Sequence, residues 1–142
     1  MNLDALVHFY HELSSENLAR LPQFYTADAY FKDPFNEVRG ADAIQRVFAH
    51  MFVQLAEPRF LIKDRWQSGE GSVLLWDFSF RMKRSPGALQ TIRGATHLRF
   101  AADGRVAWHR DYWDAAEEFY EKIPLIGTLM RLLKRMASVP NR

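Results

Sequence analysis

The chain has 142 residues, of which 48% are hydrophobic and 14% aromatic; this is the length and apolar content of one folded domain and excludes a disordered chain. It contains no cysteine, so a disulfide scaffold, a thiolate metal site and a cysteine nucleophile are excluded. The net charge is only +2 and the two densest groups of basic residues, at 81–84 and 131–135, are small, so we expect no nucleic-acid partner.

The N-terminal segment is predicted to be helical, because apolar residues recur there at helical spacing. The stripe consists of Leu3, Leu6, Val7 and Tyr10. Ser14 and Ser15 can cap a second short helix, which Pro22 bends. That helix is expected to hold Leu18, Leu21, Phe24 and Tyr25.

The same segment lacks the basic-then-apolar pattern of a signal peptide. No apolar run in the sequence reaches the roughly 18 residues of a membrane span. We therefore expect a cytoplasmic protein without a membrane span.

An extended run from Ala29 to Asp33 precedes a third helix. Pro34 disfavours helical geometry at Asp33 and ends the run. Gly40 then opens a helix, and Pro58 is expected to close that segment. Its buried stripe should contain Ile44, Val47, Phe48, Met51 and Leu55.

The second half of the chain changes to the period of β-strands. Strand-like runs lie at about 59–67, 72–83, 89–100 and 105–113. Turn-forming residues separate them at 68–71, 85–87 and 102–104. Connections this short join antiparallel neighbours, so the four runs should form a meander.

Alternation of side chains along these runs assigns most of them a face. Trp76 and Phe78 fall on the apolar face of the second run, and Thr96 falls on the apolar face of the third. In the fourth run, His109 and Asp111 share a face, but the opposite face is equally apolar. Parity alone therefore leaves two orientations open for this run.

After Asp114, placed as an N-cap, the chain should return to helix. Its apolar stripe would consist of Ile123, Ile126, Met130, Leu133 and Ala137. We expect Pro124 and Gly127 to interrupt this stripe, which favours a lid or a dimer contact over a membrane-surface helix.

Together these elements predict an α+β fold, a cone-shaped roll of three N-terminal helices packed on a strongly curved antiparallel sheet with an extra C-terminal helix. Residues 1–116 would form the domain, and 117–142 would be a helical extension packing on it. The open end of such a cone is suited to a small apolar molecule.

Three short strings carry a family resemblance. They are residues 25–34 (YTADAYFKDP), Gly40 before a helix, and residues 96–100 (THLRF) followed by Asp103-Gly104. Over about residues 3–116, the chain resembles the nuclear transport factor 2-like superfamily, especially its SnoaL-like polyketide cyclase and ketosteroid isomerase branches. That superfamily includes enzymes, ligand carriers and association modules, so the fold alone does not define an activity.

The resemblance implies roles for three residues. Asp33 falls where the isomerases have the general base that moves a proton beside a carbonyl; the alternative is that Asp33 ends a strand and makes local hydrogen bonds. Tyr10 falls where they have a tyrosine that binds the oxyanion, although a core role is favoured for it. Thr96 replaces a protonated aspartic acid, so strict ketosteroid isomerisation is not expected.

If the fourth run has the family's orientation, His109 and Asp111 point into the same cavity as Asp33, as acid–base chemistry requires. The alternative is an exposed strand end. Trp76, Phe78 and Trp113 would line the cavity. His8 and His11 lack a third metal ligand and no cofactor fingerprint is present, so neither a metal nor a cofactor is expected.

The sequence thus predicts a small-molecule isomerase or cyclase acting on an apolar, carbonyl-containing substrate. The alternative is a ligand-binding or dimerisation domain of the same fold. A homodimer through the outer face of the sheet, which carries Arg93 and His97, is also expected.

Overall fold

The computed structural model describes residues 3–69, 71–83, 87–118 and 124–139. The chain divides into two compact units, Met1–Tyr112 and Trp113–Arg142. The expected packing of residues 117–142 on the first unit stays a prediction. No helix within the described residues is both long and apolar enough to cross a bilayer, and the cytoplasmic location stays a prediction.

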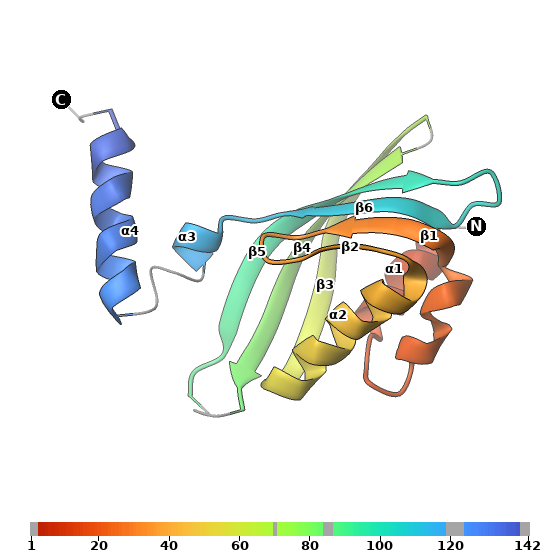
Figure 1. The fold of residues 1–142 in the computed structure, drawn as a ribbon, viewed down its shortest axis with the longest axis horizontal. Coiled ribbons are helices and arrows are strands. Elements are labelled where there is room, and N and C mark those ends of the chain that lie inside the picture. The colour runs from red at the N-terminus through yellow and green to blue at the C-terminus, as the bar shows by residue number, and fades with distance from the viewer. Residues whose placement is uncertain (1–2, 70, 84–86, 119–123, 140–142) are drawn as a thin grey trace. The chain divides into compact units, whose positions relative to one another are not determined.

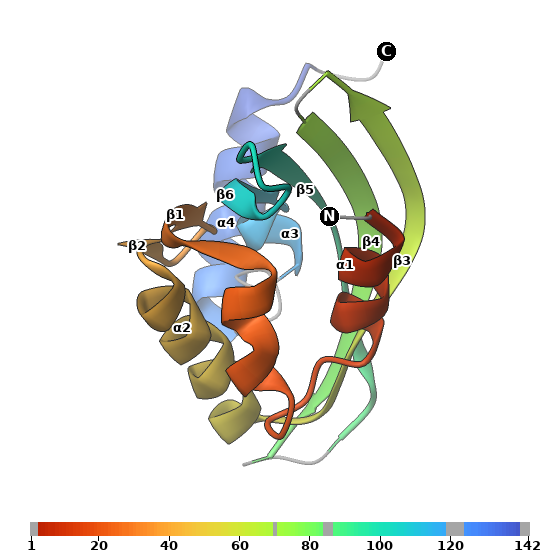
Figure 2. The ribbon, with the colours of Figure 1, turned by 90° about the vertical axis from the view of Figure 1, so that its right-hand side faces the viewer.

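The first unit is built on one six-stranded sheet, with helices on the inner side of its curve (Figures 1 and 2). In chain order its elements are α1 (Leu3–His11), the 3₁₀ helix η1 (Leu18–Gln23), β1 (Tyr25–Lys32), β2 (Glu37–Arg39), α2 (Ala41–Gln54), β3 (Leu55–Ser68), β4 (Gly71–Met82), β5 (Gln90–Phe100) and β6 (Val106–Tyr112). The strand order is β2-β1-β6-β5-β4-β3. The α+β class and the meander of the last four strands are confirmed.

The sheet differs from the prediction at its other end. The chain was expected to form a purely antiparallel sheet, but β1 pairs in parallel with β6, and the short strand β2 pairs with β1. Tyr25 was expected in the second helix, yet it is the first residue of β1. Its side chain is fully buried, and the strand pairing replaces the helical turn that its spacing indicated.

The helix boundaries follow from a few residues. Gly40 has φ of +107°, a conformation that favours glycine, and it precedes α2 as expected. The expectation that Pro58 closes this helix is wrong, because α2 ends at Gln54 and Pro58 lies inside β3. A bulge between Ala56 and Arg59 and the edge position of β3 accommodate the proline, which cannot donate to a ladder.

The core lies between the helices and the inner face of the sheet. Leu6 of α1, Ile44 of α2 and Leu74 of β4 are fully buried there. Trp76, Phe78 and Thr96 are buried on this same face, as alternation predicted. Outward-facing Val73 and Leu75 are exposed.

The second unit contains α3 (Ala115–Glu118) and α4 (Pro124–Ala137). Asp114 accepts a hydrogen bond from the N–H of Glu117, which confirms it as an N-cap. The predicted interruption at Gly127 is wrong, because Gly127 lies within the continuous helix α4. Pro124 is the first residue of α4, a position that tolerates proline, and the residues just before it lie outside the described part of the chain, so an interruption at Pro124 stays a prediction. Ile123, like residues 70 and 85–86 of the predicted turns, lies outside the described residues.

Candidate functional site

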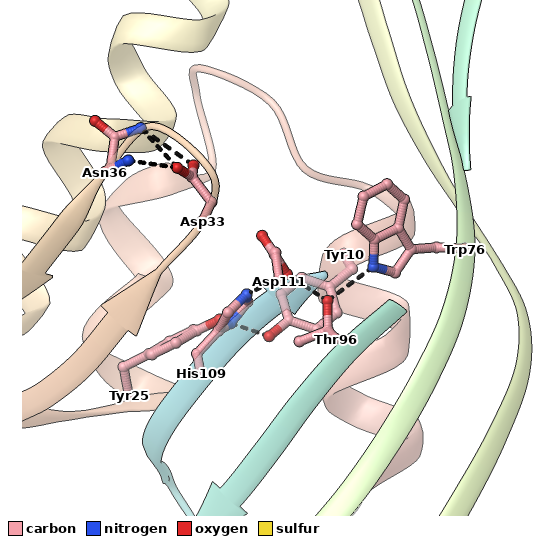
Figure 3. A network of polar contacts seen from close by, with 8 residues as sticks. All are labelled: Tyr10, Tyr25, Asp33, Asn36, Trp76, Thr96, His109 and Asp111. Atoms are coloured by element: carbon pink, nitrogen blue, oxygen red, sulfur yellow. Dashed lines mark hydrogen bonds and ion pairs between the residues drawn. The ribbon is translucent and has the colours of Figure 1, made fainter. Parts of the chain in front are cut away.

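Six polar side chains form one continuous chain of hydrogen bonds on the inner face of the sheet (Figure 3). They come from α1, β1, β4, β5 and β6. In order along the chain of hydrogen bonds they are Tyr10, Tyr25, His109, Asp111, Thr96 and Trp76.

A bulge in β6 places the two central members of this chain. Val106 pairs with Phe100 and Trp108 pairs with Arg99, so Ala107 is an extra residue without a partner on β5. This residue shifts the alternation, so that Val106 and His109 are both buried although they are three positions apart. The bulge therefore turns His109 and Asp111 inward, as the family resemblance implied and parity alone could not decide.

The Trp76 end depends on a glycine in the facing strand. Trp76 pairs with Gly94 across β4 and β5, and a Cβ atom at Gly94 would lie 2.5 Å from the indole ring. The absence of that atom lets the ring lie against β5. In this position the indole Nε1 donates a hydrogen bond of 2.7 Å to Thr96 Oγ1.

The direction of the hydrogen bonds follows from this indole, which can only donate. Thr96 Oγ1 accepts from Trp76 and uses its own hydrogen to bond Asp111 Oδ1 at 2.5 Å. Asp111 Oδ1 is therefore an acceptor. Because a carboxylate can only accept, His109 Nε2, 2.8 Å from the same oxygen, carries a hydrogen and donates it.

The tyrosine end completes the pattern. His109 Nδ1 lies 2.9 Å from the Tyr25 hydroxyl, which is 2.5 Å from the Tyr10 hydroxyl. With a neutral imidazole, Tyr10 donates to Tyr25 and Tyr25 donates to His109. With an imidazolium, both bonds would reverse, and the Tyr10 hydrogen would have no acceptor among the described residues. The neutral ring satisfies every hydrogen.

Burial reinforces the donor role of both tyrosines. It raises the pKa of Tyr10, and the nearby Asp111 carboxylate acts in the same direction. Burial likewise raises the pKa of Tyr25 well above its ordinary value. Both hydroxyls therefore stay protonated at neutral pH, and all donors in the network are directed toward Asp111.

Asp111 is the member of the His109–Asp111 pair that solvent reaches. Its side chain keeps 17% of its surface exposed, against 4% for His109. Both donors bind Oδ1, and within the described part of the chain no protein group donates to Oδ2. The site thus holds one carboxylate oxygen in place and leaves the other available.

Asp33 lies apart from this network. It occupies the turn between β1 and β2, where Oδ1 accepts the backbone N–H groups of Phe35 and Asn36, at 2.8 and 2.6 Å. The Asn36 side chain donates to both carboxylate oxygens at 3.1 Å. These are the local hydrogen bonds of the alternative interpretation, and the role of Asp33 as a base stays a prediction.

Of the other expected lining residues, Phe78 is buried and stacks on Phe60, with ring centroids 4.4 Å apart. Trp113 belongs to the second unit, so its place at the site stays a prediction. Sequence reasoning missed Tyr25 and Gly94. A glycine inside an otherwise regular strand is a signal of close approach that could have indicated Gly94.

A groove of about 450 Å³ lies between α1 and β3, away from the network. It is lined by Asp4, Val7, His8, His11, Ile62, Lys63, Asp64 and Arg65. His11 Nε2 accepts the Ile62 N–H there at 2.9 Å, and His8 pairs with Glu12. Among the described residues, no three His, Asp or Glu side chains are grouped as metal ligands.

Comparison with known proteins gives a family and a fold. A family model described as a SnoaL-like domain matches residues 6–109. No curated protein matches the sequence.

Several solved structures share the fold. A hypothetical protein from Catenulispora acidiphila, with a ketosteroid isomerase-like fold and bound trimethylamine, has a TM-score of 0.70 at 16% identity, over 82% of this chain and 87% of that chain. An NTF2-like protein of unknown function from Burkholderia pseudomallei has a TM-score of 0.69 at 20% identity, and the match covers 81% of this chain and 89% of that chain. A putative SnoaL-like polyketide cyclase from Shewanella putrefaciens has a TM-score of 0.67 at 20% identity, and the match covers 88% of this chain and 98% of that chain.

Proposed function

The chain belongs to the SnoaL-like domain family, and from that premise we propose that it binds a small apolar molecule with a carbonyl group and moves a proton on it, as an isomerase or cyclase does. Asp111 is the proposed proton acceptor and donor. His109 and Thr96 are positioning residues that hold its carboxylate. The observation that carries this proposal is the set of hydrogen bonds directed at Asp111 Oδ1, which leaves Oδ2 to face a substrate.

In the proposed reaction, Asp111 Oδ2 removes a proton from the carbon beside the substrate carbonyl, and the electron pair forms an enolate. Returning the proton to another carbon gives an isomer. Attack of the enolate carbon on a second carbonyl forms a carbon–carbon bond, and the resulting alkoxide takes the proton from Asp111, which gives a cyclised product. General acid–base catalysis of this kind contributes about 10²–10⁴-fold.

This proposal is tested by hydrogen–deuterium exchange, which reports proton removal before any product is known. A panel of apolar cyclic ketones and β-diketones is incubated with the protein in D₂O, and NMR follows the loss of the proton beside the carbonyl. Wild type should accelerate exchange for at least one compound, and Asp111→Asn should lower that rate at least about 100-fold. Asp42→Asn, an exposed carboxylate on α2, is the matched control and should match wild type.

Asp33→Asn separates the two candidate bases. A loss of exchange in this variant, with Asp111→Asn unaffected, would assign the base to Asp33 and contradict the proposal. Absence of exchange by wild type with every compound that binds would also contradict it.

A second candidate function is ligand binding without catalysis. The observation in its favour is that the network satisfies itself: in the described residues, every buried side-chain nitrogen and oxygen has a hydrogen-bond partner. A fully satisfied network can hold the core in one arrangement without taking part in a reaction. Binding of a panel compound in native mass spectrometry, with no exchange in D₂O, would favour this function.

We also propose that two copies associate through the outer face of the sheet. Exposed Leu61, Val73, Leu75 and Tyr112 gather there on three strands. A twofold axis through such a patch would bury it against itself.

A further inference from the structure

The helix α4 separates its residues into two faces. Leu129, Leu132, Leu133 and Met136 recur at helical spacing, and all four are exposed. Arg131, Lys134 and Arg135 lie on the opposite arc, because they fall about half a turn away from these positions. The helix is therefore amphipathic along its length, with leucine and methionine on one side and cations on the other.

The charge of this segment has one sign. Residues 124–142 contain four basic residues and no acidic residue. The acidic residues of the second unit, Asp114, Glu117, Glu118 and Glu121, all precede the helix. A partner that matches α4 must offer both an apolar layer and negative charge beside it.

We propose that α4 binds the surface of an anionic lipid bilayer, lying in the interface with its leucine face toward the acyl chains. The phospholipid headgroups would meet Arg131, Lys134 and Arg135, as in other interfacial helices. At 14 residues, α4 is about 21 Å long, which is shorter than the roughly 30 Å of a hydrocarbon core, so it lies on the bilayer and does not span it. Its continuous structure removes the reason to expect an interruption at Gly127.

The interaction is tested by co-sedimentation of the full chain with vesicles. Phosphatidylcholine vesicles containing 30% phosphatidylglycerol should sediment the protein, and pure phosphatidylcholine vesicles should sediment much less. Each basic residue near an anionic surface contributes about fivefold in affinity, so the triple variant R131Q/K134Q/R135Q should bind about 100-fold more weakly. The apolar-face variant L129Q/L133Q should lose at least about tenfold.

Glutamine has nearly the helix propensity of the residues replaced, and circular dichroism checks that helix content is kept. R46Q/R59Q/R99Q removes the same charge from exposed positions of the first unit and should bind like wild type. Equal weakening in this control, or no binding of wild type to anionic vesicles, would overturn the proposal. Self-association that depends on Leu129 and Leu133, without vesicle binding, would assign the face to a second copy of the chain instead.

Discussion

At the scale of single residues, the hydrogen-bond network depends most on the hydroxyl group of Tyr25. It donates to His109 Nδ1 and accepts from Tyr10, and it is fully buried. Because water cannot replace either partner, the tyrosine fixes the orientation of the imidazole. His109 in turn fixes Asp111.

Replacing Tyr25 with phenylalanine should therefore be costly. The change leaves the Tyr10 hydroxyl and His109 Nδ1 without their partners in a buried place, at about 1–3 kcal/mol each, so the free energy of unfolding should fall by at least about 2 kcal/mol. Urea denaturation measures this change in the free energy of unfolding. Tyr30→Phe, which removes an exposed hydroxyl bonded to Glu37, is the matched control and should change little.

Tyr10→Phe tests the direction of the hydrogen bonds. If Tyr10 only donates to Tyr25, its loss leaves no donor unsatisfied, and it should cost clearly less than Tyr25→Phe. A cost as large as that of Tyr25→Phe would indicate that His109 donates to Tyr25 instead, and would contradict the neutral imidazole.

The raised pKa values of Tyr10 and Tyr25 predict a loss of stability at alkaline pH. In the unfolded chain both tyrosines ionise near pH 10, whereas in the folded chain burial keeps them protonated. Above pH 10 the unfolded state therefore binds fewer protons, and stability falls with rising pH, by up to about 1.4 kcal/mol per pH unit for each tyrosine. Below pH 10 this contribution is fully present. Urea denaturation at pH 9, 10 and 11 should show that the free energy of unfolding falls more steeply with pH for wild type than for a Tyr10→Phe, Tyr25→Phe double variant. The same pH dependence in both proteins would contradict the raised pKa values of the two tyrosines.

At the scale of the elements, β4 and β5 are fitted to each other through Trp76 and Gly94. Gly94→Ala places a methyl group 2.5 Å from the indole, which has to move and lose its bond to Thr96. Overpacking of this kind costs about 1–3 kcal/mol. We expect the free energy of unfolding, measured by urea denaturation, to fall by that amount.

A second substitution provides the control for this prediction. The three closest atoms to the added methyl group all belong to the six-membered ring of the indole. In a Trp76→Phe background, which shortens that side chain, Gly94→Ala should cost much less. An equal cost in both backgrounds would show that the glycine is needed for backbone reasons and not for the tryptophan.

The elements also show what the sequence could and could not predict. Local signals were sufficient for α1, the start of α2 and the meander, because apolar spacing, Gly40 and the turn residues act within a few positions. The pairing of β1 with β6 joins segments about eighty residues apart, and nothing local encodes it. The sequence does not indicate the bulge at Ala107 either, because alanine fits a regular strand as well as a bulged one.

The candidate site follows the same division. Strand parity predicted Thr96 and Trp76. The family resemblance predicted His109 and Asp111, because parity left their orientation open. The link from His109 to Tyr10 was not predicted, because it requires Tyr25 to leave the expected helix and join β1. Asp33 was expected beside them, but the hairpin turn between β1 and β2 uses its carboxylate locally.

At the scale of the whole molecule, the outer face of the sheet exposes several large apolar side chains to water. Leu75 pairs with Ala95, which pairs with Tyr112, and in the neighbouring row Trp66 pairs with Val73. Leu75 and Tyr112 are 40% and 50% exposed. Contiguous patches of this kind mark interaction surfaces in proteins.

Leu75→Glu should therefore dissociate the proposed dimer. In an isologous contact each charge would meet the partner's copy of the same apolar patch, so the dissociation constant should rise at least about 100-fold, as for the loss of a central interface residue. Sedimentation velocity should show a dimer for wild type and a monomer for the variant. Because Leu75 is already exposed in the single chain, unfolding should change by no more than about 0.5 kcal/mol. Val53→Glu, at an exposed position of α2, introduces the same charge away from the sheet and should remain dimeric. A monomeric wild type, or a variant that still dimerises, would exclude this face as the contact.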